Sequence, residues 1–99
     1  MSTVFISHPF SSSPKWNCLQ VAKIARRLAF EGHLPLAPQL LRPHFIDEFV
    51  ERDFALNLCL QFVALAGEVR VYGEPSEGMR LEIVEAERLG IPAVKGELP

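Results

Sequence analysis

The sequence lacks an excess of positive charge. Its 10 lysines and arginines are outnumbered by 12 aspartates and glutamates, which gives a formal net charge of −2. Binding along the backbone of a nucleic acid needs a concentrated basic surface, so this composition argues against a polymeric nucleic-acid partner. A small anionic ligand is compatible with it, because the free N–H groups at a helix start bind anions without net positive charge.

Long hydrophobic runs are also missing. The strongly apolar stretch 54–65 is interrupted by Asn57 and Gln61 and is too short to span a bilayer. The amino end lacks a basic stretch followed by an apolar run, so no signal peptide is expected. These absences predict a cytoplasmic protein with no membrane partner.

Cysteine and metal-binding patterns are scarce. Cys18 and Cys59 lie in apolar helical patterns without CxxC spacing, which favours buried thiols over a disulfide. The three histidines, at positions 8, 33 and 44, lack zinc-ligand spacing, so no metal site is predicted. No P-loop, nucleophile elbow or full GxGxxG fingerprint is present. No cofactor is expected.

What is present is enough apolar sequence for one folded domain over residues 1–99, with 48% hydrophobic residues. Short apolar runs predict strands at 4–6, 34–37, 69–72 and 91–94. Ser13 and Pro14 start an amphipathic helix that Gly32 ends, and a second helix covers 77–89 between Ser76 and Gly90.

Residues 38–44 are expected to form a loop, and residues 45–65 allow two interpretations. One is a single long helix, which we favour because 69–72 makes a better strand and Ala66-Gly67 a natural stop. The other is a helix to about Cys59 followed by a strand at 62–65.

The alternation of strands and helices predicts an α/β fold. A mostly parallel sheet of four to five strands, covered by helices on both faces, makes a three-layer Rossmann-like or flavodoxin-like sandwich. Ligands bind beyond the carboxyl ends of such strands. The loops at that edge are 7–13, 38–44 and 73–76.

Glu82 is the most informative residue in these segments. At 100° per residue it falls within the apolar arc of its helix, which also carries Met79, Ile83, Ala86 and Leu89. An inward carboxylate faces the sheet or a cleft, and burial raises its pKa, as is common for catalytic acids, bases and nucleophiles. An ion pair with an arginine of a neighbouring element explains the same position.

Ser76 and Gly78 frame the start of that helix. A hydroxyl and free N–H groups at such a point suit a phosphate or carboxylate, although an ordinary N-cap has the same pattern. Asn17, on the sheet-facing side of the first helix, either hydrogen-bonds a ligand or ties down the loop 7–13. His8 follows the first strand and is a further candidate contact.

Several of these segments together resemble the nucleoside 2-deoxyribosyltransferase-like superfamily, most closely its small bacterial and phage-type members. They are Val4-Phe5-Ile6-Ser7-His8-Pro9-Phe10, Asn17, Gly32-His33-Leu34-Pro35-Leu36-Ala37-Pro38, Val71-Tyr72-Gly73 and Ser76-Glu77-Gly78-Met79-Arg80-Leu81-Glu82-Ile83. The resemblance implies a Rossmann-like fold that is dimeric or higher.

The resemblance also implies a chemistry. In the characterised enzymes a glutamate attacks C1′ of the sugar, and water or a new base resolves the glycosyl-enzyme intermediate; Glu82 occupies its place. Ser76 matches the serine that binds a 5′-phosphate, and Asp53 is the candidate for an aspartate on the middle element. The implied ligand contacts are Ser7, His8, Pro9, Phe10, Asn17, Gly73, Ser76, Gly78 and Met79.

Three hypotheses follow for the ligand and the reaction. The first is an enzyme that cleaves or transfers the N-glycosidic bond of a nucleoside or its 5′-monophosphate. The second is a non-catalytic nucleotide-binding module with the same fold. The third is a structural domain in which Glu82 forms a salt bridge.

Overall fold

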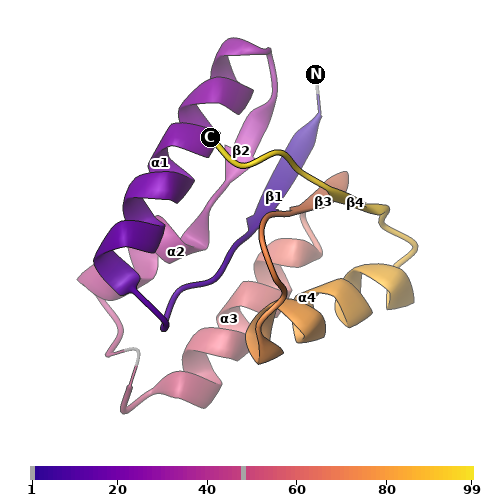
Figure 1. The fold of residues 1–99 in the computed structure, drawn as a ribbon. Helices are drawn as coiled ribbons and strands as arrows, with labels where there is room; N and C mark the ends of the chain where they lie inside the picture. The colour runs from indigo at the N-terminus through magenta and orange to yellow at the C-terminus, as the bar shows by residue number, and fades with distance from the viewer. Residues whose placement is uncertain (1, 48) are drawn as a thin grey trace.

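The computed structural model describes residues 2–47 and 49–99, and its centre is a four-stranded parallel sheet (Figure 1). The strands are β1 (Thr3–Ser7), β2 (Leu34–Leu36), β3 (Glu68–Val71) and β4 (Ala93–Lys95). Their order is β2-β1-β3-β4, and every pairing is parallel. The predicted α/β fold with a parallel sheet is confirmed.

Helices cover both faces of this sheet. One face packs on α1 (Pro14–Phe30), and the other on α3 (Arg52–Val63) and α4 (Glu77–Arg88). The side chains of β1 alternate between the two cores. Val4 and Ile6 pack with residues of α1, whereas Phe5 packs with residues of α3 and α4. Burial on both sides explains why this strand is a continuous apolar run rather than an alternating one.

The chain reverses its direction across the sheet between β1 and β3. From β1 it passes through α1 to β2 on one side, then crosses back to β3 on the other side of β1. The loops that follow β1 and β3 therefore lead to helices on opposite faces and leave a crevice at the carboxyl ends of these strands. Open α/β sheets bind ligands at such a point.

The segment between β2 and β3 differs from both interpretations of the sequence. The expected long helix over 45–65 is wrong, because α3 begins only at Arg52, and the alternative strand at 62–65 is not formed. The Asp47 carboxylate accepts the N–H groups of Phe49 and Val50, at 3.0 and 3.1 Å. These local hydrogen bonds compete with the helical ones and hold a turn before the helix.

The expectation of a loop at 38–44 is wrong, because the whole segment is helical. It contains the single turn α2 (Pro38–Leu41) and a 3₁₀ turn, η1 (Arg42–His44). Proline is well suited to the first turn of a helix, since its missing N–H has no intrahelical partner there, and both turns carry a proline near their start. The last strand also begins two residues later than predicted, at Ala93.

Two further expectations concern the cysteines and membranes. Within the described residues neither cysteine forms a disulfide, and Cys59 is buried on α3 while Cys18 is half-buried on α1. No helix within residues 2–47 and 49–99 has the length and apolar content needed to span a bilayer.

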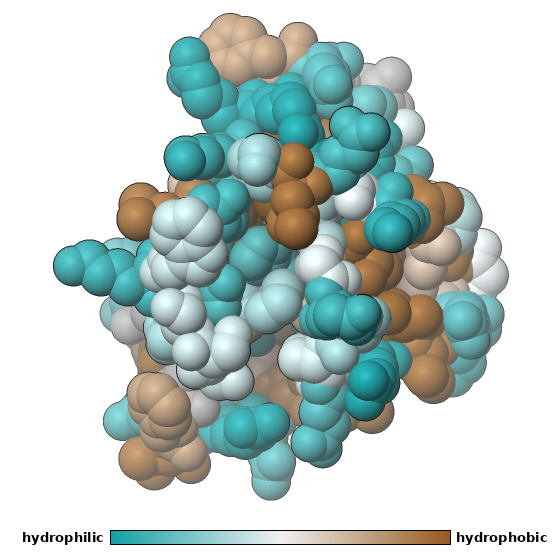
Figure 2. Space-filling view, viewed as in Figure 1, coloured by the Kyte–Doolittle hydropathy of each residue, from teal (hydrophilic) through white to brown (hydrophobic). Residues whose placement is uncertain are grey.

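The segment after β4 turns back across the sheet toward α1 (Figure 1). Its Gly96 N–H donates to the Val71 carbonyl at 2.8 Å, and Arg27 Nη2 donates to the Glu97 carbonyl at 2.6 Å. Gly96 lies against the ring of Tyr72, which is fully buried. On the face of the molecule seen in Figure 2, hydrophilic side chains predominate and hydrophobic ones form separate patches between them.

We predict that Gly96→Ala destabilises the protein. A Cβ at this position would lie 2.3 Å from Cε1 of Tyr72, so the ring or the backbone must move. Overpacking of this kind costs about 1 to 3 kcal/mol of unfolding free energy, measurable by urea denaturation. Gly67→Ala is the matched control, because a Cβ there meets its nearest atom at 3.6 Å. Equal stability of the two variants would contradict the prediction.

Candidate functional site

A pocket of about 430 Å³ lies at the carboxyl edge of the sheet, between the loop after β1 and the starts of α3 and α4. Its volume is in the range of small-molecule sites. The loop after β1 and the segment before α3 contribute His8, Phe10, Ser11, Arg42 and Phe49. The two helices contribute Arg52, Asp53, Ala55, Leu56, Ser76, Glu77, Gly78, Met79, Leu81 and Glu82.

The start of α4 supplies polar groups to one wall. Ser76 is the N-cap, and its Oγ accepts the Met79 N–H at 3.3 Å. The hydroxyl hydrogen is not used in that bond and can donate to a ligand. The N–H groups of Glu77 and Gly78 belong to the first turn, where a helix offers them no carbonyl of its own. Hydroxyl, amides and helix dipole together suit an anionic group.

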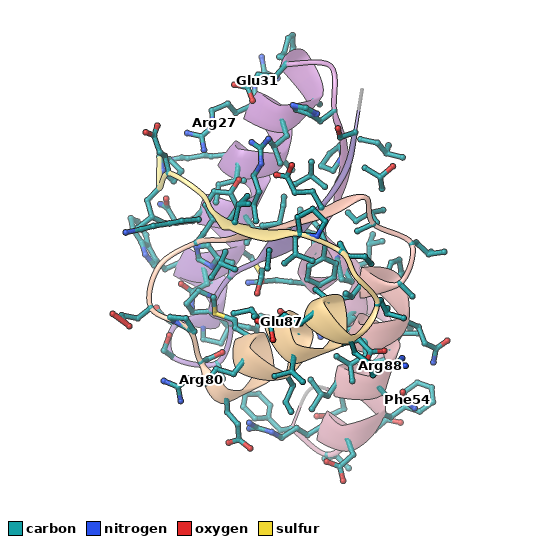
Figure 3. All side chains as sticks on the ribbon, turned by 90° about the vertical axis from the view of Figure 1, so that its right-hand side faces the viewer. Arg27, Glu31, Phe54, Arg80, Glu87 and Arg88 are labelled. Carbon is teal, nitrogen blue, oxygen red and sulfur yellow. The ribbon has the colours of Figure 1, made fainter. Side chains whose placement is uncertain are left out.

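Glu82 is the buried carboxylate of the pocket, with 8% of its surface exposed. The Ser7 hydroxyl donates to its Oε1 at 2.7 Å, joining α4 to the end of β1. The inward orientation predicted from helical phase is confirmed. Figure 3 shows the contrast along the same helix, since Arg80, Glu87 and Arg88 lie on its outer side.

Burial raises the pKa of the Glu82 carboxyl. Water solvates a carboxylate better than the protein interior does, so desolvation favours the protonated form. Three neighbours oppose this effect on the pKa: the hydrogen bond from Ser7, a hydrogen bond from the Cys59 thiol and the positive charge of Arg42. Desolvation is the largest of these influences.

Arg42 reaches the pocket from η1 and is itself 9% exposed. Its Nη1 donates to Cys59 Sγ and, at 3.5 Å, to the Ala55 carbonyl. The guanidinium also lies 5.9 Å from the centre of the Phe10 ring. An arginine near Glu82 was one interpretation of the sequence, but its identity was not predicted. Only a charged residue within the apolar stretch 40–46 hinted at it.

The structure brings most of the predicted site residues together. The pocket lining includes both proposed catalytic carboxylates, Glu82 and Asp53. It also includes five of the predicted ligand contacts: His8, Phe10, Ser76, Gly78 and Met79. Asp53 lies in the first turn of α3, which begins at Arg52, and its side chain is exposed.

Four predicted contacts are not among the lining residues: Ser7, Pro9, Asn17 and Gly73. Asn17 Nδ2 donates to the Phe10 carbonyl at 3.1 Å and to Ser12 Oγ at 3.2 Å, which ties down the loop after β1. The Pro9 carbonyl accepts from Gln39 Nε2 at 3.1 Å. Gly73 has a φ of +74° and brings the turn after β3 close to the Pro9 ring.

The pocket also contains an arginine and several apolar side chains that the sequence did not indicate. Arg52, Phe49, Leu56 and Leu81 all line the pocket. From the sequence alone, Arg52 fits a solvated charge face on its helix, since nothing in its pattern distinguishes it from one. Within the described residues, no three histidine, cysteine, aspartate or glutamate side chains are grouped to hold a metal ion.

Comparisons with known proteins support the fold. A family model described as "Domain of unknown function (DUF7768)" matches residues 2–95. No curated protein matches the sequence. Among solved structures, a 2-deoxyribosyltransferase from Bacillus psychrosaccharolyticus is similar with a TM-score of 0.73 at 18% identity, and the match covers 94% of this chain and 70% of that one. At this identity the likeness shows the fold alone.

We predict that replacing Glu82 by glutamine changes how stability depends on pH. Because burial places the folded-state pKa above the unfolded one, the folded protein binds this proton more tightly. The stability of the wild type therefore falls as the pH rises through the window between the two pKa values. Glu82→Gln has no such proton. It should gain stability relative to the wild type as the pH rises.

Urea unfolding from about pH 4 to about pH 8 measures this difference. Glu87→Gln, an exposed change on the same helix, is the control and should give a flat difference. A difference for Glu82→Gln that is equally flat would show that burial does not perturb this carboxyl.

Proposed function

The chain belongs to the DUF7768 family, and we propose that it binds a nucleoside or nucleoside 5′-monophosphate and cleaves or transfers its N-glycosidic bond. Glu82 is the nucleophile in this proposal. One observation carries it: a buried carboxylate lines a pocket of ligand size, on the same helix whose first turn offers an anion site. The resemblance of residues 76–83 to the 2-deoxyribosyltransferase-like superfamily supports it.

The spacing along α4 suits such a ligand. Ser76 and Glu82 are six residues apart, which corresponds to about 9 Å along the helix axis. A phosphate held by the Ser76 hydroxyl and the amides of Glu77 and Gly78 leaves room for a sugar that extends toward the carboxylate. The base then lies among the remaining lining, where Phe10 and Phe49 offer aromatic faces.

The solved 2-deoxyribosyltransferase adds to this support. That enzyme is described as a biocatalyst for the synthesis of nucleosides, and its fold is shared over most of this chain. Nucleosides and nucleotides are therefore the first ligands to test. The superfamily resemblance further supports a homodimer or a higher homo-oligomer, and the cytoplasmic location expected from the sequence is part of the same proposal.

The reaction follows from the chemistry of the carboxylate. A Glu82 oxygen forms a bond to C1′ while the bond from C1′ to the base nitrogen breaks, and the electron pair leaves with the base. Asp53 lies on the facing helix as the candidate donor of the proton that the base needs. Water or a second base then attacks C1′, its proton passes to Asp53, and the bond from C1′ to the carboxylate oxygen breaks.

Burial contributes to this reaction. The attacking carboxylate is charged, whereas the glycosyl ester that it forms is neutral. The desolvation that raises the pKa of Glu82 also disfavours the charged reactant relative to the ester. The Ser7 hydroxyl holds one oxygen in place, so the carboxylate meets the sugar in a fixed orientation.

We predict that Glu82→Gln abolishes base release from a deoxynucleoside or deoxynucleoside 5′-monophosphate. Glutamine keeps the shape and an oxygen acceptor for Ser7, but its amide is not a nucleophile. Removal of a nucleophile costs about a thousandfold or more in kcat, which chromatography of the free base measures. Glu87→Gln should retain wild-type turnover. Wild-type rates in Glu82→Gln would exclude this carboxylate as the nucleophile.

A second candidate function is a non-catalytic nucleotide-binding module. The observation that favours it is the position of Arg42 and Cys59 beside Glu82, since a carboxylate held by an arginine and a thiol also serves a purely structural purpose. This candidate gives a saturable thermal shift with a nucleotide and no free base after long incubation. Absence of a shift with every nucleoside and nucleotide would reject both candidates.

We predict that Ser76 distinguishes a monophosphate from a nucleoside. Ser76→Gly removes the hydroxyl but costs the helix start only a few tenths of a kcal/mol, because glycine is a tolerated N-cap. Ser76→Asp keeps the cap and places a negative charge at the proposed phosphate site. Affinity for the 5′-monophosphate should fall about tenfold in the first variant and further in the second. Affinity for the nucleoside should stay unchanged in the glycine variant, as measured by calorimetry.

A further inference from the structure

A second cavity, of about 390 Å³, lies on the face of the sheet that α1 covers. α1 packs mainly over β1 and β2, and the segment after β4 crosses the rest of this face (Figure 1). Glu68, Arg70 and Tyr72 form the floor of the cavity. They alternate along the chain with Val69 and Val71, which pack on the other face. The sheet therefore separates this cavity from the candidate functional site.

The walls of the cavity come from α1 and from the segment after β4. Arg27 and Glu31 lie one helical turn apart and both line it, and Figure 3 shows them near the same end of α1. Arg27 Nη2 also donates to the Glu97 carbonyl, which holds the segment after β4 against α1. Three parts of the sequence therefore meet around one polar cavity.

The Tyr72 hydroxyl is the feature of this cavity that packing does not explain. The side chain is fully buried and packs with apolar residues of α1. Within residues 2–47 and 49–99, its oxygen has no hydrogen-bond partner. A buried hydroxyl without a partner lowers stability, and phenylalanine would fill the same space without that cost. The hydroxyl therefore indicates a partner that binds to the protein.

Arg70 does not supply the missing acceptor. Its Nε donates to Glu68, which is the main cause of the raised pKa of the guanidinium, and Tyr72 adds to this effect. A guanidinium donates hydrogen bonds and does not accept them. Any contact between Arg70 and Tyr72 would therefore use the phenol oxygen and leave the hydroxyl hydrogen free to donate to a ligand.

Residues 96–99 cover the hydroxyl end of the Tyr72 ring. A Cβ on Gly96 would lie 2.5 Å from Cζ, which carries the hydroxyl, and 2.3 Å from the adjacent Cε1. Two hydrogen bonds hold this cover, from the Gly96 N–H to the Val71 carbonyl and from Arg27 to the Glu97 carbonyl. Residues 97–99 are otherwise exposed. A shift of this short segment would open a path from the cavity to the hydroxyl.

The charges of the lining determine the kind of ligand. Arg27, Arg70 and the Tyr72 hydroxyl offer donors that suit a carboxylate, which arginine binds through paired N–H groups. The lining has three basic and three acidic residues, so a simple anion gains little net attraction. Glu31 and Glu68 instead suit a positive group. A ligand that carries a positive group beside its carboxylate satisfies both sets.

We propose that this cavity is a second binding site, specific for a small zwitterion of the α-amino-acid type. The ligand carboxylate binds the Tyr72 hydroxyl and the remaining donors of the two arginines, and the ammonium group faces the two glutamates. The volume of the cavity suits a small molecule. The inference does not depend on the proposed function, because this cavity and the pocket around Glu82 share no lining residue.

Tyr72→Phe tests the hydroxyl in the absence of a ligand. Loss of a buried hydroxyl without a partner should leave the urea midpoint of unfolding unchanged or raise it, in buffer free of amino acids. Ser7→Ala is the matched variant, because it removes a buried hydroxyl that has a partner, and it should lower the midpoint. A lower midpoint in Tyr72→Phe would show that the hydroxyl already has its partner within the protein, and would overturn the inference.

Binding is measured by ¹H–¹⁵N NMR titration with glycine, L-serine and L-glutamine. Acetate and methylamine are the controls, since each carries one of the two charges. At least one amino acid should give saturable shifts at the amides of Tyr72, Gly96 and Glu97, and neither control should saturate at the same concentrations. The inference fails if no amino acid saturates, if acetate binds equally well, or if the shifts lie at Ser76 and Gly78 instead.

Variants then assign the binding to this cavity. Tyr72→Phe and Arg70→Gln should each weaken amino-acid binding about tenfold, the effect of one hydrogen bond to a charged group. Arg26→Gln is the control, because Arg26 is exposed on α1, lies on the Phe30 ring and does not line the cavity. Glu82→Gln should bind the amino acid as the wild type does, whatever its effect on base release. Unchanged affinity in Tyr72→Phe, or lost affinity in Glu82→Gln, would overturn the inference.

Discussion

Hydrogen bonding between β1 and β3 joins two parts of the chain that are more than 60 residues apart. Ser7 lies opposite Val71, and the Tyr72 N–H donates to the Ser7 carbonyl at 2.9 Å. This pairing holds the two crevice loops at one edge and places Ser7 beneath α4, where its hydroxyl meets Glu82. If the register slipped by one residue, the side chain of Ser7 would face α1, and the carboxylate would lose this partner.

The buried carboxylate imposes a cost that the surrounding elements must offset. The unfolding free energy of a small domain is only about 5 to 15 kcal/mol. A buried charge without compensating partners lowers it by several kcal/mol. Hydrogen-bond donors from β1 and α3, together with the charge from η1, converge on one side chain of α4. A residue that served packing alone would be replaced by an apolar one at no loss. The nucleophilic role that we propose for Glu82 would give this carboxylate a chemical purpose.

Much of this site follows from periodicity. The inward direction of Glu82 needs only the 100° step of a helix, and the cap at Ser76 needs only the residue preferences of a helix start. The parallel α/β sandwich likewise follows from the alternation of strands and helices and from right-handed crossovers. Arg42 lies outside this reasoning, because its position depends on the turns between β2 and α3. There, the Asp47 carboxylate binds backbone N–H groups and prevents the helix that periodicity predicted.

The same segment between β2 and α3 has a consequence for how the protein can change. Ser7, Cys59, Ser76 and Glu82 are at the ends or in the bodies of regular elements, whose geometry the sheet fixes. Arg42 and Phe49 come instead from short turns that carry few sheet contacts. Turns accept insertions and substitutions more readily than strands and helices do. Variation in this segment can alter which molecules enter the pocket while the carboxylate stays where it is, so recognition and reactivity are free to evolve at different rates.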